Sequence, residues 1–186
     1  MLFAPERLSR WAGGLDHVVE VSGRLASWTG FALVLVMAFN VLLRYGFHTG
    51  SVAMQELEWH LMAPVSLLCM AYAIKHEGHV RVDILYGRFS PHWQRIIEFI
   101  SCLCAVALCA IIIKLSYGYV EQSYRIGEGS PDPGGLPYRF ILKSMIPAGF
   151  TLLLLQSLAA SLRALIVLLG GEPPAAKPEH ELEHAA

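Results

Sequence analysis

The ionisable residues that could do chemistry in this chain stand at the edges of long apolar runs. Arg44 closes the first run, and Glu56 and Glu58 stand just before the second. Unpaired charges at membrane depth are costly, so we expect these side chains to find partners. The spacing predicts an ion pair of Arg44 with Glu56 or Glu58 across a short loop. The alternative is a docking point for an external partner.

Polar side chains inside the apolar runs are few. Asn40 and Gln156 are uncharged, and interhelical hydrogen bonds of this kind contribute about 0.6–2 kcal/mol each. His60 is the only histidine within one of the four runs. A haem in a four-helix bundle usually takes two axial ligands at matching depth. A redox anchor that carries haem is therefore the alternative interpretation, not the favoured one.

The chain shows no catalytic set. It has no Gly-rich phosphate loop, no HExxH motif and no plausible Ser-His-Asp group. Its four cysteines all fall in apolar runs, and Cys102 and Cys104 point to different sides of a helix, which is poor metal geometry. We therefore expect no enzyme, no metal site and no cofactor.

The elements that hold these residues are membrane helices. The composition is 55% hydrophobic and 16% charged, against about 25% charged in soluble domains. Leu25 to Leu43 is nineteen residues without a charge, and about 20 apolar residues cross a bilayer as a helix. The net charge of −1, with no basic face, argues against a nucleic-acid partner.

The fold class predicted is an all-α membrane protein with four transmembrane helices plus an N-terminal interfacial amphipathic helix. Residues 1–170 form one four-helix domain, and residues 171–186 form a disordered cytoplasmic tail. Ser90-Pro91 has the chemistry of a helix start, and Ser130 to Pro137 reads as a turn-rich loop. The four expected spans are 24–45, 57–76, 94–117 and 140–169.

The distribution of lysine and arginine predicts the orientation. Residues 75–95 contain four cationic side chains, whereas residues 46–56 contain none. Cytoplasmic loops carry the excess of such residues. We expect both termini in the cytoplasm and a multi-pass protein of the bacterial inner membrane.

Three short stretches resemble one transporter family. They are Asn40-Val-Leu-Leu-Arg-Tyr45, Gln55-Glu-Leu-Glu58 and Glu77-Gly-His-Val-Arg-Val-Asp83. Together with the four-span layout, they are similar to the small membrane subunit (DctQ type) of tripartite ATP-independent periplasmic (TRAP) transporters. The loop around Pro131 to Tyr138 resembles one branch of that family.

The resemblance implies a division of labour. A large multi-span permease subunit would carry the solute and sodium sites, and a periplasmic solute-binding protein would deliver an organic acid. The small subunit would be a scaffold in this symport, in contact with membrane lipids. By motif match, the structural or partner-interface residues would lie in the same stretches: Arg44, Glu56, Glu58, His79, Arg81 and Asp83.

Two further expectations concern assembly. The chain could instead be a self-contained small transporter that works as a homo-oligomer, but its halves share no evident motif. If it is a scaffold, small residues of the fourth span should lie at close contacts with the large permease. Those residues are Ala148, Gly149, Ala159 and Ala160.

Overall fold

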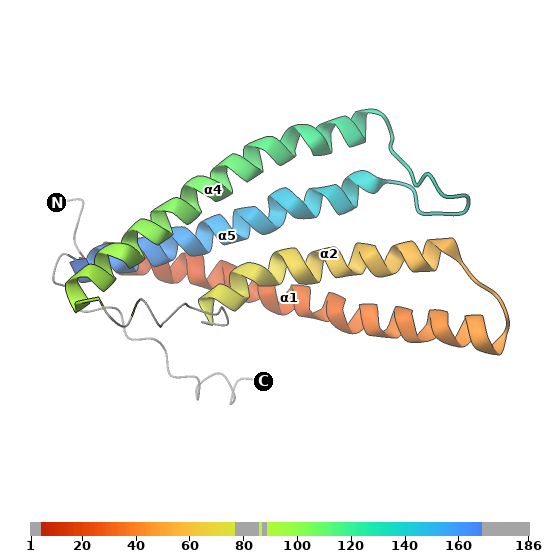
Figure 1. Ribbon diagram of the computed structural model, residues 1–186, viewed down its shortest axis with the longest axis horizontal. Helices are drawn as coiled ribbons and strands as arrows, with labels where there is room; N and C mark the ends of the chain where they lie inside the picture. Colours follow the sequence, from red (N-terminus) through yellow and green to blue (C-terminus); the bar gives the residue numbers. More distant parts are fainter. Residues whose placement is uncertain (1–4, 77–85, 87–88, 169–186) are drawn as a thin grey trace.

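The described residues form four long helices that run along the longest axis of the molecule (Figure 1). The computed structural model describes residues 5–76, 86 and 89–168, with side chains from Ser9 onward. The helices are α1 (Pro5–Gly46), α2 (Val52–Lys75), α4 (Pro91–Arg125) and α5 (Arg139–Leu168). All four are long and apolar enough to cross a membrane, and no strand occurs among the described residues. The predicted all-α membrane fold is confirmed.

Local sequence signals account for several helix ends. Ser51 precedes α2 in an extended conformation, and its hydroxyl accepts a hydrogen bond from the Met54 N–H at 3.4 Å. Pro91 is the first residue of α4 after Ser90, as its fixed φ angle favours. Pro64 lies inside α2 without ending that helix, which helices in a membrane tolerate when neighbours satisfy the freed groups.

Helix α1 is continuous over 42 residues. At 1.5 Å per residue it is about 60 Å long, twice the roughly 30 Å of a hydrocarbon core. The segment expected as an interfacial helix is thus continuous with the first span in one helix, with no break at Gly13-Gly14. Ala12, Val19 and Ala26 are buried at seven-residue spacing, so one continuous face contacts the neighbouring helices.

Helix α5 is the centre of the bundle, because it contacts α1, α2 and α4. Helix α1 pairs with α2, and α4 lies chiefly against α5. The buried residues of α4, Cys109, Ser116 and Ser123, again follow a seven-residue spacing. At Gly149 of α5, an added Cβ atom would lie 2.6 Å from the Leu67 carbonyl oxygen, so α2 and α5 approach closely there.

Small side chains fill the interior, and large apolar side chains point outward. Fully buried residues include Ala71 and Ala159, whereas Phe39, Leu103 and Leu115 are more than half exposed. This arrangement is the reverse of a soluble bundle. It fits helices that contact each other through small residues and present their bulk to an apolar environment.

We name the two ends of the bundle by what they carry. At the connection end, residues 47–51 join α1 to α2 and residues 126–138 join α4 to α5 (Figure 1). At the terminal end, α1 and α4 begin and α2 and α5 finish. The charged side chains of the candidate site gather at these two ends.

Candidate functional site

Glu56 is the centre of the connection end. Although it lies in the second turn of α2, it is only 3% exposed. Its carboxylate accepts hydrogen bonds from the Ser130 hydroxyl and, at 2.6 Å, from the Leu136 main-chain N–H. A guanidinium nitrogen of Arg139, the first residue of α5, lies 3.7 Å away. One carboxylate thereby joins α2 to the 126–138 connection and to α5.

The 126–138 connection folds back on itself above Glu56. The Ser130 N–H donates to the Leu136 carbonyl, and the Gly135 N–H donates to the Asp132 carbonyl, both at 3.0 Å. Gly134 has a φ of 81°, the left-handed region that glycine adopts without strain. At Gly135 an added Cβ would lie 2.8 Å from a Glu56 oxygen. The predicted turn-rich loop is therefore a turn closed by its own main-chain hydrogen bonds, and it lies directly against the Glu56 carboxylate.

A second acidic residue fastens α4 to α5. Glu128 forms an ion pair with Lys143, whose ammonium lies 4.0 Å from the ring centroid of Tyr119. The hydrogen bond from Lys143 lowers the pKa of Glu128 below its ordinary value. The Arg139 N–H donates to the Glu128 carbonyl at 2.9 Å, so main chain and side chain both hold the start of α5.

The expected ion pair of Arg44 with Glu56 or Glu58 is wrong. Glu58 accepts a hydrogen bond from the Asn40 amide at 2.8 Å, and Glu56 faces the 126–138 connection. Among the described side chains Arg44 forms no ion pair, and it is exposed. The physical reason is the direction in which the side chains point. Glu56 points toward α5 and away from α1. Glu58 is taken by Asn40, which lies one helical turn before Arg44 in α1.

The terminal end holds a charge network that the sequence analysis missed. Arg163 of α5 forms a two-pronged ion pair with Asp16 of α1. Glu20 of α1 contacts Lys75 at 2.6 Å and His76 at 3.0 Å, both at the end of α2. Asp16 and Glu20 are four residues apart and so share a helix face, which is the signal that could have identified them. Both lie in the segment that the sequence predicts as an interfacial amphipathic helix.

The remaining predicted residues have varied outcomes. His79, Arg81 and Asp83 lie outside the described residues. The Nδ1–H of His60 donates to the Glu56 carbonyl at 2.7 Å. Within the described part of the chain, no cluster of three or more histidine, cysteine or acidic side chains could hold a metal ion.

Two of the small residues expected to contact a partner are used inside the chain. Gly149 lies against the Leu67 backbone, and Ala159 is fully buried in this chain. That expectation is wrong for both, because they serve the internal approach of α5 to its neighbours. Ala148 instead lines an open groove of about 700 Å³ together with residues of α1 and α2, such as Leu25 and Leu68.

The sequence matches a known family over most of its length. Residues 33–166 match the tripartite ATP-independent periplasmic transporters, DctQ component. A Haemophilus influenzae protein named as a TRAP transporter small permease protein is 29% identical over 128 residues, which are 67% of this chain and 78% of that protein. The C4-dicarboxylate TRAP transporter small permease protein DctQ of Pseudomonas aeruginosa is 28% identical over 109 residues, 55% of this chain and 52% of that protein.

A third relative is a longer protein. The isethionate TRAP transporter permease protein DctMQ of Oleidesulfovibrio alaskensis is 29% identical over 141 residues, which are 71% of this chain but 22% of that protein. The family match begins in the second half of α1 and reaches the last turn of α5, so it includes Glu56 and its partners. This multi-pass membrane chain belongs to the DctQ component family, the small permease subunits of TRAP transporters, and is a transporter component, not an enzyme.

Proposed function

We propose that this chain is the stationary scaffold for a large multi-span permease subunit. The complex would take up an organic acid by sodium symport across the bacterial inner membrane, and a periplasmic solute-binding protein would deliver the solute. In this proposal both termini are cytoplasmic and the connection end faces the periplasm.

The observation that carries the proposal is the placement of the charged pairs. Asp16–Arg163 and Glu20–Lys75 hold the terminal end, and Glu56–Arg139 and Glu128–Lys143 hold the connection end. These pairs join α1 to α2 and α5 at the terminal end, and they join α2 and the 126–138 connection to α5 at the connection end, which suits a rigid frame. The part of a transporter that carries the solute across the membrane needs buried ionisable groups and broken helices near the bilayer midplane. The middle of these helices instead supplies uncharged polar groups such as Gln156.

The flanks of the frame support a partner in the membrane. Large apolar side chains of α1 and α4 point away from the bundle, among them Phe31, Leu35, Leu108 and Ile111. Lipid covers part of such a surface, and a permease subunit would cover the rest. The DctMQ relative is consistent with this partner, because this chain aligns with only 22% of that permease protein.

The names of the relatives support the solute class. One is named for isethionate and another for C4-dicarboxylates, and both solutes are small organic anions. The groove of about 700 Å³ in this subunit is lined by apolar and uncharged polar side chains, with no cation to hold such an anion. The solute site is therefore assigned to the large subunit.

Reconstitution into liposomes tests the proposal. Uptake should require this chain, the large subunit, the binding protein and an inward sodium gradient, with a potassium gradient as the matched control. Liposomes that contain this chain alone should take up no solute above the empty-liposome background. Saturable uptake by this chain alone, or full uptake without it, would overturn the scaffold assignment.

Cysteine labelling tests the orientation. In a variant without Cys69, Cys102, Cys104 and Cys109, a cysteine at Asp132 on the exposed connection should react with a membrane-impermeant maleimide added to intact spheroplasts. A cysteine at His92, exposed at the terminal end, should react only after the membrane is opened. The opposite result would invert the topology.

A further inference from the structure

The first half of α1 carries a second row of residues beside the one that is buried in the bundle. The buried row contains Ala12, Val19 and Ala26. The neighbouring row alternates spacings of four and three residues, the pattern by which one helix packs against another. We call it the outer seam, and its residues are Trp11, Leu15, Val18, Ser22, Leu25 and Thr29.

The described helices leave the outer seam open. Trp11, Val18 and Leu25 are 71%, 45% and 66% exposed. Toward the middle of α1, Ser22, Leu25 and Thr29 line the groove of about 700 Å³, and α5 and α2 supply its other lining residues. Small and apolar side chains of this kind let membrane helices approach closely, so the seam and the groove together suit a further helix.

The outer part of the seam extends beyond the lipid tails. Asp16 and Glu20 contact cationic side chains of α5 and α2, so the charged groups of the terminal end lie at one level. Charged groups of membrane helices gather where the hydrocarbon core ends. Val18 lies between these two acidic residues, and Trp11 lies five residues before Asp16, about 8 Å farther along the helix. Lipid tails therefore do not cover the outer part of the seam.

The shape of the groove argues for a different protein as the occupant. In a two-fold dimer, the same surface patch of each copy meets itself. The groove is concave, so two copies joined through it would leave both grooves empty. The occupant also has to follow the seam from the groove between membrane helices to the charged level and beyond. A helix of another membrane protein meets both requirements.

Basic side chains border the seam. Arg10, His17 and Arg24 each stand one position before a seam residue, and all three are exposed. Arg24 is paired with Glu20, whereas Arg10 forms no ion pair among the described side chains. Acidic side chains of an occupant would complement this edge.

We propose that the outer seam receives a membrane helix of the large permease subunit, with apolar side chains in the groove and acidic side chains beside Arg10 and His17. This inference rests on the proposed function, which supplies the large subunit as the partner. The seam precedes residue 33, where the family match begins. The contact is therefore an addition to whatever the matched region contributes to assembly.

Photo-crosslinking in membranes that contain both subunits tests the contact. A benzophenone amino acid at Val18 should give a product with the combined mass of this chain and the large subunit. The matched control is the same probe at Ser27, which is exposed and lies nine residues away, on the opposite side of α1. Equal yields at the two positions, or products of Val18 with lipid or a second copy alone, would overturn the proposal.

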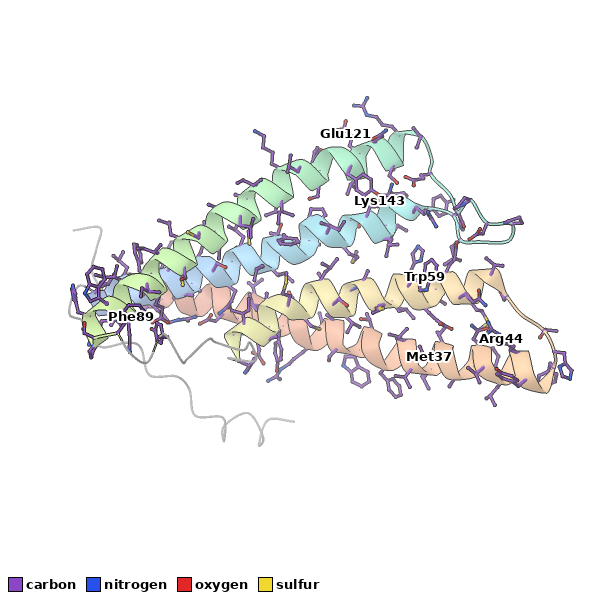
Figure 2. All side chains as sticks on the ribbon, viewed as in Figure 1. Met37, Arg44, Trp59, Phe89, Glu121 and Lys143 are labelled. Atoms are coloured by element: carbon purple, nitrogen blue, oxygen red, sulfur yellow. The ribbon has the colours of Figure 1, made fainter. Side chains whose placement is uncertain are left out.

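Co-purification with the tagged full chain gives the second measurement. The double variant Trp11→Ser and Val18→Asn should retain the large subunit on the order of tenfold less, because it removes two apolar contacts. The matched control is Trp93→Ser, which should change nothing. Trp93 is 57% exposed in the first turn of α4, at the terminal end, where Figure 2 shows Phe89.

Two further readouts separate the possible failures. Neither tryptophan variant should change the melting temperature of this chain alone, because both side chains are exposed. Wild-type retention by the double variant would overturn the seam but leave the scaffold proposal standing. Failure of the wild-type chain to retain any large subunit would overturn the scaffold proposal itself.

The basic edge is tested by salt. Arg10→Gln should lower retention of the large subunit at about 0.1 M salt and have little effect at about 1 M, where charges are screened. Arg125→Gln, which removes an exposed cation at the connection end, is the matched control and should change nothing. Equal retention by Arg10→Gln and the wild type at low salt would overturn the acidic edge of the occupant.

Discussion

The two ends of the bundle are fastened by different chemistry. At the connection end, one nearly inaccessible carboxylate, Glu56, accepts from a main-chain N–H and a hydroxyl of a turn more than seventy residues away. At the terminal end, side-chain pairs join the helices, and the side chains of Arg163 and Asp16 are 30% and 21% exposed. Burial and main-chain donors make the first fastening insensitive to the solvent, whereas the second depends on it.

The difference also follows the chain. Glu56 and its partners lie inside the region that matches the family, whereas Asp16 and Glu20 precede it. The connection end is therefore built wholly from the family region, and the terminal end adds residues from the first half of α1. This contrast predicts unequal effects of mutation.

The largest effect is expected for Glu56→Ala. It leaves the Leu136 N–H and the Arg139 guanidinium near a buried space without their acceptor, which is more damaging than loss of a surface pair. The melting temperature of the chain in detergent should fall by about 5 °C. Protease cleavage in the 126–138 connection should also become faster.

Glu121→Ala is the control for this variant, because it removes a carboxylate from an exposed pair on α4. It should shift the melting temperature by about 1 °C or less. If Glu56→Ala and Glu121→Ala melt alike, Glu56 does not hold the connection and the contrast between the two ends fails.

The helices themselves were accessible from the sequence because their signals are local. Uncharged runs such as Leu25–Leu43 and the Ser90-Pro91 start are visible within a few residues. The continuity of α1 through Gly13-Gly14 was not predictable from the sequence, because glycine weakens a helix locally and only contacts with distant helices compensate. Ala12 and Val19 supply those contacts.

The partners of the charged residues were not predictable in the same way. Short sequence distance favoured Arg44 for Glu56, twelve residues away, but the partner turn lies seventy-four to eighty residues along the chain. Only the position of α5 beside α2 brings that turn over Glu56. The sequence identified Glu56 and Glu58 as polar residues that need partners, and the packing of α5 decided which partners they have.

A smaller, salt-dependent effect is expected for Arg163→Ala. Its two contacts with Asp16 are partly exposed, so we expect about 1 kcal/mol at low salt. Raising the salt from about 0.1 to 1 M shortens the screening length from about 10 to 3 Å. The difference in melting temperature between the variant and the wild type should shrink accordingly. The difference in melting temperature for Glu56→Ala should not shrink with added salt. Equal salt sensitivity of Arg163→Ala and Glu56→Ala would remove the distinction between the two ends.

The smallest effect is expected for Glu128→Gln, which tests whether a partly exposed pair at the connection end behaves like the pairs of the terminal end. Glu128 has one ammonium partner, Lys143, and lies outside the helices. Because Lys143 lowers the pKa of Glu128 in the folded chain, the pair stabilises the fold above the ordinary pKa of 4.5. That stabilisation is lost as the pH falls through the lowered value.

The melting temperatures of wild type and Glu128→Gln should therefore differ by a constant amount from about pH 7 to pH 5.5 and converge below about pH 4.5. Glu121→Gln, which removes an equal charge from α4, corrects for the change in net charge. A difference that persists at the lowest pH would mean that Glu128 acts through the turn backbone and not through its charge, which would place it with Glu56.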